Sequence, residues 1–441
     1  MTQTTEKQLQ GKKILFATVA ADGHFNPLTG LAKFLMDAGC DVRWYTSGIY
    51  KDKLAQLGIQ NYPFIKSRDI TGSSLHELFP ERVTIADAGE KANFDMINVF
   101  IKPGPGKFED ILDIRKTFPF DAVIADNMFP AIPYISAKID VPVISIGIIP
   151  LPESSDDLGP YGPGFYPPTN DVERLKMAEL RMAFKNVVYK AGTDCLTALL
   201  EQYGVPYNGV DIFDILTKAP DLYLQVGSPS LEYKRSSLGK NVRFIGALLP
   251  YTESRVQAQW SDERLKRYQK VVLVTQGTIE GDVSKLLEPT LDAFKGTDTL
   301  VIAATGGFHT TELKNKYDFD NLIIEDYIPF DQIMPLADVF VTNGGYGGTL
   351  LAVEHQLPLV TAGLYEGKAE ICARIGFFKY GIDLKTERPA SADILAAVKV
   401  IMDDPQYKDN ITLLSREMEG FDAKALCAGY LSELLISSPA S

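Results

Sequence analysis

The feature that most constrains this chain is a strand, loop and helix arrangement that occurs twice. Near the start, an apolar run at residues 14–19 leads into a loop at 20–25 and then a helix that Asn26 can cap. A second start lies at Lys270, where residues 271–275 lead into Gln276, Gly277 and Thr278. Short apolar strands that alternate with helices are typical of parallel sheets with helices on both faces. The pattern therefore predicts an α/β protein with two doubly wound domains.

The spacing of the expected strands predicts how the chain is divided. We expect strands at 14–19, 41–46, 122–125 and 143–147, and then at 271–275, 300–304, 322–325, 339–342 and 359–362. The predicted parts are a first domain over 1–235, an irregular polar linker over 236–268, a second domain over 269–422, and a helix in 423–441 that crosses back to the first domain. Segments 60–110 and 150–190 are rich in Pro, Gly and aromatic residues, and we expect loops and small helices there.

Composition excludes several classes of protein. The chain has 441 residues and a formal net charge of −13, which argues against a nucleic-acid scaffold or a polybasic membrane binder. Its four cysteines are far apart, which favours reduced thiols over a zinc ribbon or a disulfide framework. The N-terminus lacks an apolar signal segment, and the most apolar stretch, 141–151, falls short of the roughly 20 residues of a membrane span. We therefore expect a cytoplasmic protein without a membrane span.

One histidine and one aspartate stand where parallel sheets bind ligands. His24 follows the first strand and precedes a helix start, and Asp126 follows the strand at 122–125. The carboxyl ends of parallel strands share one edge of the sheet, so the two side chains can meet there. A neutral imidazole held by a carboxylate is a suitable general base. Residues in these positions can also be purely structural.

A glycine-rich turn follows the strand at 339–342. It reads Asn343-Gly344-Gly345-Tyr346-Gly347-Gly348-Thr349, and we expect a helix over Thr349–Gln356. Glycines let the backbone approach a ligand closely, and amides at a helix start bind phosphate. Thr349 can add a hydroxyl donor and Asn343 an amide. The alternative is a tight turn whose glycines serve packing alone.

Together these motifs resemble those of family 1 glycosyltransferases, in particular the bacterial enzymes that act on macrolides and flavonoids. Residues 23–28, Gly-His-Phe-Asn-Pro-Leu, resemble the G-H-x-x-P signature of that family, and the stretch from Tyr327 to Gly381 is similar to its nucleotide-sugar signature. The resemblance covers most of the chain. It implies the GT-B fold, in which two Rossmann-like domains face each other across a cleft, with the acceptor on the first domain and the donor on the second. It also implies an inverting reaction that needs no metal and no cofactor besides the nucleotide-sugar co-substrate.

The resemblance assigns roles to positions of this sequence. His24 is similar to the general base and Asp126 to its orienting partner. Tyr327 and Ile328 match the positions that stack on and contact the donor base, and the glycine-rich turn matches the diphosphate loop. The donor-side residues are Gln276, Gly277, Thr278, Tyr327, Ile328, Asn343, Gly344, Gly345, Gly348, Thr349, Glu366 and Lys368.

Several departures from the family pattern bear on the donor. Asn343 stands where many members have a histidine, Leu351 where a glutamate binds the ribose, and Gly367-Lys368 where an Asp-Gln pair binds the sugar. These losses remove reasons to prefer UDP-glucose. The expected donor is a dTDP-linked 6-deoxy sugar, with dTDP-rhamnose the best single choice, UDP-sugars tolerated, and new sugar contacts from Glu366 or Lys368.

The expected acceptor is a hydroxyl of a small apolar or aromatic molecule such as a flavonoid. The candidate acceptor-binding residues are Phe100, Phe129, Tyr161 and Phe165, although aromatic side chains in such segments serve packing as often as binding. Two other functions stay open at this point. One is a nucleotide-sugar epimerase of the same fold, and the other is a catalytically silent partner protein that binds a nucleotide-sugar.

Overall fold

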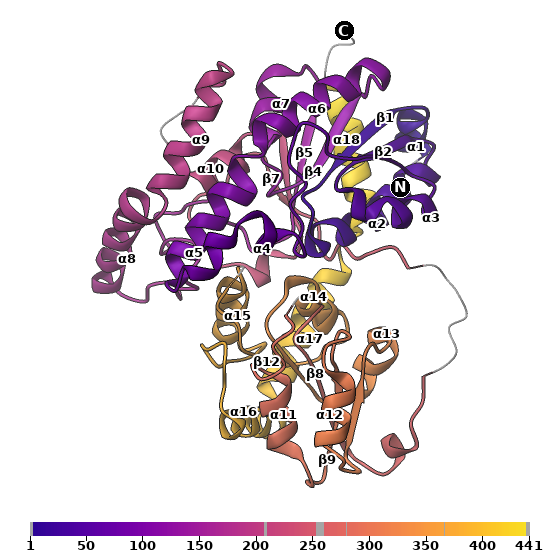
Figure 1. The fold of residues 1–441 in the computed structure, drawn as a ribbon, viewed down its shortest axis with the longest axis vertical. Helices are drawn as coiled ribbons and strands as arrows, with labels where there is room; N and C mark the ends of the chain where they lie inside the picture. The colour runs from indigo at the N-terminus through magenta and orange to yellow at the C-terminus, as the bar shows by residue number, and fades with distance from the viewer. Residues whose placement is uncertain (1–2, 207–209, 253–259, 279, 366, 438–441) are drawn as a thin grey trace.

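Two parallel sheets form the framework of the protein, one in each half of the chain (Figure 1). The structure is a computed structural model that describes residues 3–206, 210–252, 260–278, 280–365 and 367–437. Within these residues the first sheet has the strand order β3-β2-β1-β4-β5-β6-β7 and the second the order β10-β9-β8-β11-β12-β13. Every neighbouring pair is parallel. The predicted α/β class with two doubly wound domains is confirmed.

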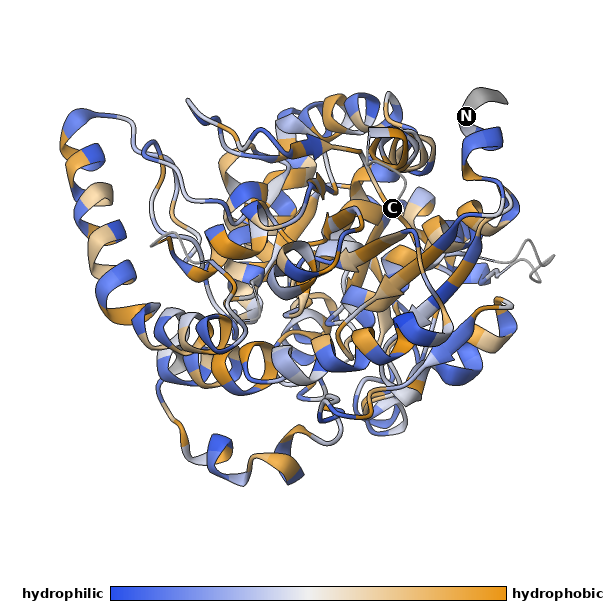
Figure 2. Ribbon diagram, turned by 90° about the horizontal axis from the view of Figure 1, so that it is seen from above, coloured by the Kyte–Doolittle hydropathy of each residue, from blue (hydrophilic) through white to orange (hydrophobic). Residues whose placement is uncertain are grey.

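The strands of the first sheet are β1 (Lys13–Ala17), β2 (Asp41–Tyr45), β3 (Gln60–Tyr62), β4 (Ala122–Asp126), β5 (Val143–Gly147), β6 (Leu222–Gln225) and β7 (Val242–Phe244). Those of the second sheet are β8 (Lys270–Thr275), β9 (Thr299–Ala304), β10 (Leu322–Glu325), β11 (Val339–Thr342), β12 (Leu359–Thr361) and β13 (Gly381–Asp383). The central strands are buried along their whole length and mostly apolar, because helices cover both faces of each sheet. Figure 2 shows this concentration of apolar residues along the strands.

The helices of the first half are α1 (Gln3–Leu9), α2 (Asp22–Asp37), α3 (Lys51–Gln56), α4 (Leu75–Leu78), α5 (Ala88–Asp95), α6 (Gly104–Thr117), α7 (Ile132–Lys138), α8 (Asp171–Ala183), α9 (Lys190–Gln202) and α10 (Ile212–Lys218). Those of the second half are α11 (Leu287–Phe294), α12 (Thr310–Lys316), α13 (Phe330–Ile333), α14 (Tyr346–Glu354), α15 (Lys368–Phe377), α16 (Ser391–Asp403), α17 (Gln406–Glu419) and α18 (Ala423–Ser437). Among the described residues, no helix combines the length and apolar character that a membrane span requires.

Two predicted boundaries differ from the structure. β7 lies inside the stretch 236–268 that was expected to be linker, and it pairs with β6, so the first sheet extends to Phe244. The first-domain helix was expected to follow Asn26 as its cap, with Pro27 in its first turn, but α2 starts at Asp22 and carries Pro27 inside it. His24 therefore lies in the first turn of a helix and not in a loop.

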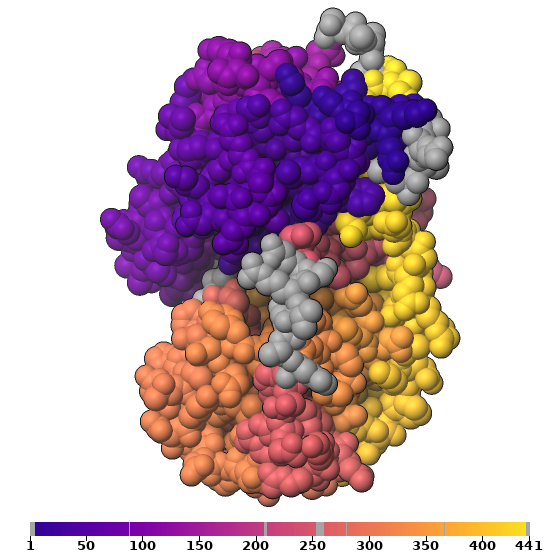
Figure 3. Space-filling model, turned by 90° about the vertical axis from the view of Figure 1, so that its right-hand side faces the viewer, coloured from indigo at the N-terminus to yellow at the C-terminus, as the bar shows by residue number. Residues whose placement is uncertain are grey.

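The two halves are joined by packing and by a buried ion cluster. One apolar cluster includes both Phe16 in β1 and Leu273 in β8. The C-terminal segment runs along both halves, and its last helix, α18, packs on α1 and α2 (Figure 3). Arg374 in α15 is 2% exposed and lies 2.7 Å from Glu232 and 2.8 Å from Glu370. Glu370 also accepts the backbone amides of Gly162 and Gly164 at 2.7 and 3.0 Å. Because every member of this cluster has a partner, it fixes α15 against the first half.

Candidate active site

His24 is held by a buried carboxylate at the carboxyl edge of the first sheet. Its Nδ1 lies 2.8 Å from Asp126 Oδ1, and the imidazole is 16% exposed while Asp126 is fully buried. β1 and β4 are hydrogen-bonded neighbours, which brings the loop after β1 beside the end of β4. The expectation that these two residues meet at one sheet edge matches the observed geometry.

Asp126 has three hydrogen-bond partners, and these contacts decide which nitrogen of the His24 ring carries the proton. Its Oδ2 accepts the Val19 amide at 2.8 Å, and its Oδ1 accepts the Met128 amide at 2.9 Å. An ionised carboxylate only accepts hydrogen bonds, so His24 Nδ1 carries the proton in this contact. Nε2 is then the basic nitrogen, and it makes no hydrogen bond to any of the described residues. The pair can take a proton at Nε2.

The glycine-rich turn places the start of α14 at the end of β11. The helix starts at Tyr346, three residues before the expected start, and no side chain caps it. The first-turn amides are those of Tyr346, Gly347 and Gly348, and amides of this kind are suited to hold a phosphate. Gly344 has a φ of +79°, and a Cβ there would lie 2.5 Å from Cys372 Sγ, so only glycine fits.

Thr349 does not present its hydroxyl to this turn. The residue is fully buried, and Oγ1 donates to the Gly345 carbonyl at 3.0 Å. The expectation that Thr349 supplies a free hydroxyl donor is therefore wrong, because the earlier start of α14 places Thr349 in the second turn of the helix.

Two further loops meet the glycine-rich turn. Asn343 Nδ2 donates to the Gln276 carbonyl at 2.6 Å, which joins the turn to the loop after β8. The Gln276 side chain is buried and donates to the Glu280 carbonyl at 3.0 Å, so its backbone and not its amide faces the turn. Gly277 has a φ of +81°, and Thr278 beside it is exposed.

Tyr327 exposes its aromatic ring to solvent at the same edge of the second sheet. It is 71% exposed, and its hydroxyl donates to the Gly306 carbonyl at 3.1 Å. Ile328 is buried beside it. Lys368 is the first residue of α15, and its backbone carbonyl lies 3.8 Å from where a Gly344 Cβ would be, so α15 begins beside the turn. Glu366 lies outside the described residues.

The two halves of the candidate site touch. The Tyr346 hydroxyl donates to the Val226 carbonyl at 2.6 Å, directly after β6, and α2 is in contact with α14. The helix that carries His24 in its first turn therefore packs on the helix whose first turn is the glycine-rich one. Sequence reasoning missed the role of Tyr346, because nothing in a glycine-rich motif indicates that its one aromatic residue bridges two domains.

The four candidate acceptor residues do not lie together. Phe100 lines a pocket beside residues 19–21, but Phe129 is fully buried and packs edge-on against Tyr45 in the core. Phe129 is therefore not an acceptor contact, because a side chain closed off by its own core cannot reach a ligand. Tyr161 packs against Phe213 and Phe165 against Phe184, and neither residue lines that pocket.

Sequence reasoning missed two basic residues of this pocket, Arg68 and Lys107. A signal for Lys107 was available. It shares one face of α6 with Ile111 and Ile114, at positions i, i+4 and i+7, and both isoleucines are buried. A lysine on the apolar face of a helix indicates an interior role.

Comparison with known proteins agrees with this architecture. Residues 308–421 match the family described as "UDP-glucoronosyl and UDP-glucosyl transferase". The chain is 32% identical over 415 residues to 4'-demethylrebeccamycin synthase of Lentzea aerocolonigenes, a match that spans 94% of this chain and 97% of that protein. It is 29% identical to UDP-glucosyltransferase 1 of Beauveria bassiana, over 93% of each chain.

Solved structures show the same fold. The calicheamicin glycosyltransferase CalG4 aligns with a TM-score of 0.74 at 18% identity, covering 98% of this chain and 100% of that one. The spinosyn rhamnosyltransferase SpnG complexed with thymidine diphosphate aligns with a TM-score of 0.65 at 14% identity, covering 95% and 99%. At these identities the likeness shows the fold alone, and that fold is GT-B.

The protein is thus a GT-B glycosyltransferase, an enzyme that moves a sugar from a nucleotide-sugar donor to an acceptor. Within that class, the chain belongs to family 1, the UDP-glucoronosyl and UDP-glucosyl transferase family. The predicted family resemblance is confirmed.

Proposed function

We propose that this enzyme transfers a sugar with inversion at the anomeric carbon and without a metal ion, and that His24 is its general base. The observation that carries the proposal is the 2.8 Å contact from His24 Nδ1 to buried Asp126, with Nε2 left open on a helix that packs against α14. A hydroxyl of the acceptor gives its proton to Nε2 as it attacks the anomeric carbon from the side opposite the diphosphate. Asp126 fixes the tautomer and stabilises the imidazolium that forms.

The leaving diphosphate gains negative charge as its bond to the sugar breaks. The uncapped amides of Tyr346, Gly347 and Gly348 are preorganised donors for that charge. Gly344 and Gly345 allow the backbone to approach the diphosphate, and the exposed ring of Tyr327 offers a face on which the base can stack. Transfer that continues in excess EDTA supports a metal-independent reaction, and activity that returns only with a divalent cation refutes it.

The donor we propose is a dTDP-linked 6-deoxyhexose, with rhamnose as the first choice. Leu351 packs against the apolar core in the second turn of α14, so no carboxylate is offered to the ribose from that position. The relatives named UDP-glucosyltransferases favour UDP-glucose as the second candidate. Calorimetric titration with dTDP and with UDP separates the two, since clearly tighter binding of UDP refutes the dTDP proposal.

The acceptor we propose is a small apolar or aromatic molecule with a free hydroxyl, for which a flavonoid is a suitable probe. The pocket beside residues 19–21 supports this, because Phe64, Ile70, Val99 and Phe100 give it apolar walls. Incubation with dTDP- and UDP-sugars and a mixed aromatic panel, followed by mass spectrometry, tests the function. Sugar mass on an acceptor with inverted configuration by NMR supports the proposal. An isomerised donor would indicate an epimerase, and no conversion at all a silent binding protein.

A further inference from the structure

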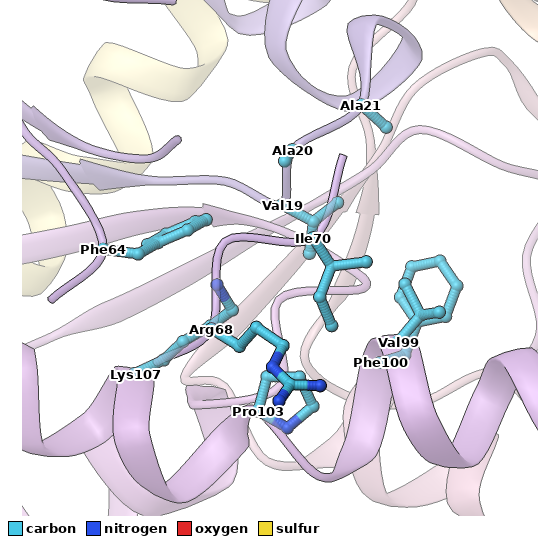
Figure 4. Close-up of a pocket in the computed structure, with 10 residues that line it drawn as sticks. All are labelled: Val19, Ala20, Ala21, Phe64, Arg68, Ile70, Val99, Phe100, Pro103 and Lys107. Atoms are coloured by element: carbon cyan, nitrogen blue, oxygen red, sulfur yellow. The ribbon is translucent and has the colours of Figure 1, made fainter. Parts of the chain in front are cut away.

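The pocket of the first domain is apolar on most sides but contains two cations. Residues 19–21 border it on one side, Val99 and Phe100 on another, and Phe64 and Lys107 opposite them, with Arg68 between (Figure 4). It encloses about 360 Å³ of empty space including its open mouth. The Ala21 carbonyl that ends this wall accepts the His24 amide at 3.0 Å, so the pocket adjoins the first turn of α2.

Lys107 is buried without a carboxylate partner. Lys107 is 4% exposed, and its Nζ lies 3.0 Å from the centroid of the Phe64 ring. Within the described part of the chain, Nζ makes neither an ion pair nor a hydrogen bond. A ring face stabilises an ammonium by less than a paired anion does. A lysine is almost never buried in this way unless something pairs with it.

None of the carboxylates near Lys107 forms an ion pair with its Nζ in the described part of the chain. Asp110 accepts the Tyr45 hydroxyl at 2.7 Å and the Lys66 amide at 2.9 Å. Asp126 accepts from His24 and two amides. Asp69 accepts the Ser47 hydroxyl at Oδ2, at 2.8 Å, while its buried Oδ1 has no hydrogen-bond partner among the described residues. These three groups and the Arg68 guanidinium are the charged groups around the lysine. None of the carboxylates reaches it closely enough to neutralise it.

Burial lowers the pKa of the Lys107 ammonium to about 7, although Asp69, Asp126 and Asp110 act to raise it. An anion beside Nζ would stabilise the ammonium by its charge and so raise the pKa of Lys107 again. The ammonium would then hold its proton in the complex at a pH where the free enzyme has begun to lose it.

We propose that Lys107, with Arg68 at the mouth, binds a carboxylate of the acceptor, so that the acceptor class is a hydroxylated aromatic acid. The apolar walls hold the ring, the two cations hold the acid group, and the hydroxyl is directed toward His24 at the adjoining end of the pocket. This assignment rests on the proposed function, because it takes the pocket to be the acceptor site.

The test is binding, so that it does not depend on turnover. Phenolic benzoates, cinnamates and naphthoates, each paired with its methyl ester, are titrated by calorimetry into the whole protein with UDP or dTDP present. At pH 6.5 at least one acid is expected to bind about 10- to 100-fold more tightly than its ester, the range for a hydrogen bond to a charged group. Lys107→Met removes that preference, and Lys116→Met, an exposed lysine on the same helix, leaves it unchanged.

A pH series on the unmodified protein gives a second readout. The Kd of the acid rises above pH 7 as the free lysine loses its proton, by at most roughly the 10- to 100-fold that the charged lysine contributes, while the Kd of the ester stays flat. Equal binding of acid and ester in every pair, or no binding of either, overturns the inference. If neutral phenols nevertheless receive sugar, the proposed function holds and only the carboxylate inference fails. If no acceptor receives sugar, the proposed function is refuted.

Discussion

Replacing Asp126 by asparagine should disable the base while leaving most of the fold in place. The carboxylate accepts the Val19 amide at one oxygen, and the Met128 amide and His24 Nδ1 at the other. An amide offers one accepting oxygen and one donating NH₂ group. In either orientation the NH₂ meets a donor, because every contact at this site comes from an N–H.

The structure sets the size of both effects. With the NH₂ toward Val19, one buried amide loses its acceptor, which costs about 1–3 kcal/mol of stability. With the NH₂ toward His24, the ring is also driven to the wrong tautomer. In both cases the negative charge that would face the imidazolium is gone. Asp126→Asn is therefore expected to lower kcat by about 10²–10⁴, the range of a general base and of a displaced triad aspartate.

The assay is the initial rate of sugar transfer at saturating donor, with urea denaturation and nucleotide titration on the same preparation. The expected result is a large loss in kcat, a modest loss in stability and an unchanged Kd for the nucleotide. A variant that folds and keeps more than a tenth of the wild-type kcat would refute the reasoning. An equal loss in nucleotide affinity would also refute it, because Asp126 lies in the other half of the chain from the glycine-rich turn.

Three further substitutions test the donor side and the junction between the halves. Gly344→Ala forces a left-handed φ on alanine and drives its Cβ into Cys372 Sγ, so we expect a loss of about 1–3 kcal/mol in urea denaturation and about tenfold weaker nucleotide binding by calorimetry. Arg374→Met strands buried Glu232, and we expect a loss of about 3–5 kcal/mol in the same denaturation assay. Tyr327→Ala removes an exposed ring, so stability is expected to hold while the nucleotide Kd rises about 5- to 150-fold, from roughly 1–3 kcal/mol per stacked base.

Each of these has a matched control. Gly429→Ala adds a methyl group in open space within α18 and is expected to stabilise the protein by up to about 1 kcal/mol. Arg388→Met breaks an exposed pair with Asp282 and should change stability by less than about 1 kcal/mol. Tyr327→Phe keeps the ring and should bind the nucleotide nearly as well as wild type. A stability loss for Gly429→Ala as large as that for Gly344→Ala, or for Arg388→Met as large as that for Arg374→Met, would contradict the explanation from local contacts. Nucleotide binding by Tyr327→Phe as weak as that by Tyr327→Ala would contradict the stacking role of the ring.

Much of the fold follows from the sequence because the central strands are buried, predominantly apolar runs. The limits of β5, β10 and β11 were predicted at the residues where they occur, since each is a run of buried residues that ends at a turn. β3, β6, β7 and β13 were not predicted, because three or four residues carry too short a period to distinguish a strand from a loop. β12 is equally short but was predicted, because it lies in the mostly apolar run 359–362.

The site was predicted in part, for reasons that particular residues make clear. The meeting of His24 and Asp126 follows from two parallel strands ending at one edge. The start of α2 was placed too late because Pro27 is typical of a first turn, whereas here it lies inside the helix and deprives only the Gly23 carbonyl of its partner. Phe129 was misassigned because sequence does not distinguish an aromatic residue of the core from one of a pocket. Lys107 was missed although it shares one face of α6 with the buried Ile111 and Ile114, a spacing that indicates an interior lysine.

The most direct measurement compares sugar transfer and nucleotide binding in His24→Ala, with a weakly acidic alcohol as the acceptor. The account predicts that kcat falls by about 10²–10⁴ while the Kd of the nucleotide stays within twofold of wild type, because the imidazole acts on the acceptor and the glycine-rich turn holds the donor. A folded His24→Ala protein that loses less than tenfold in kcat would contradict it.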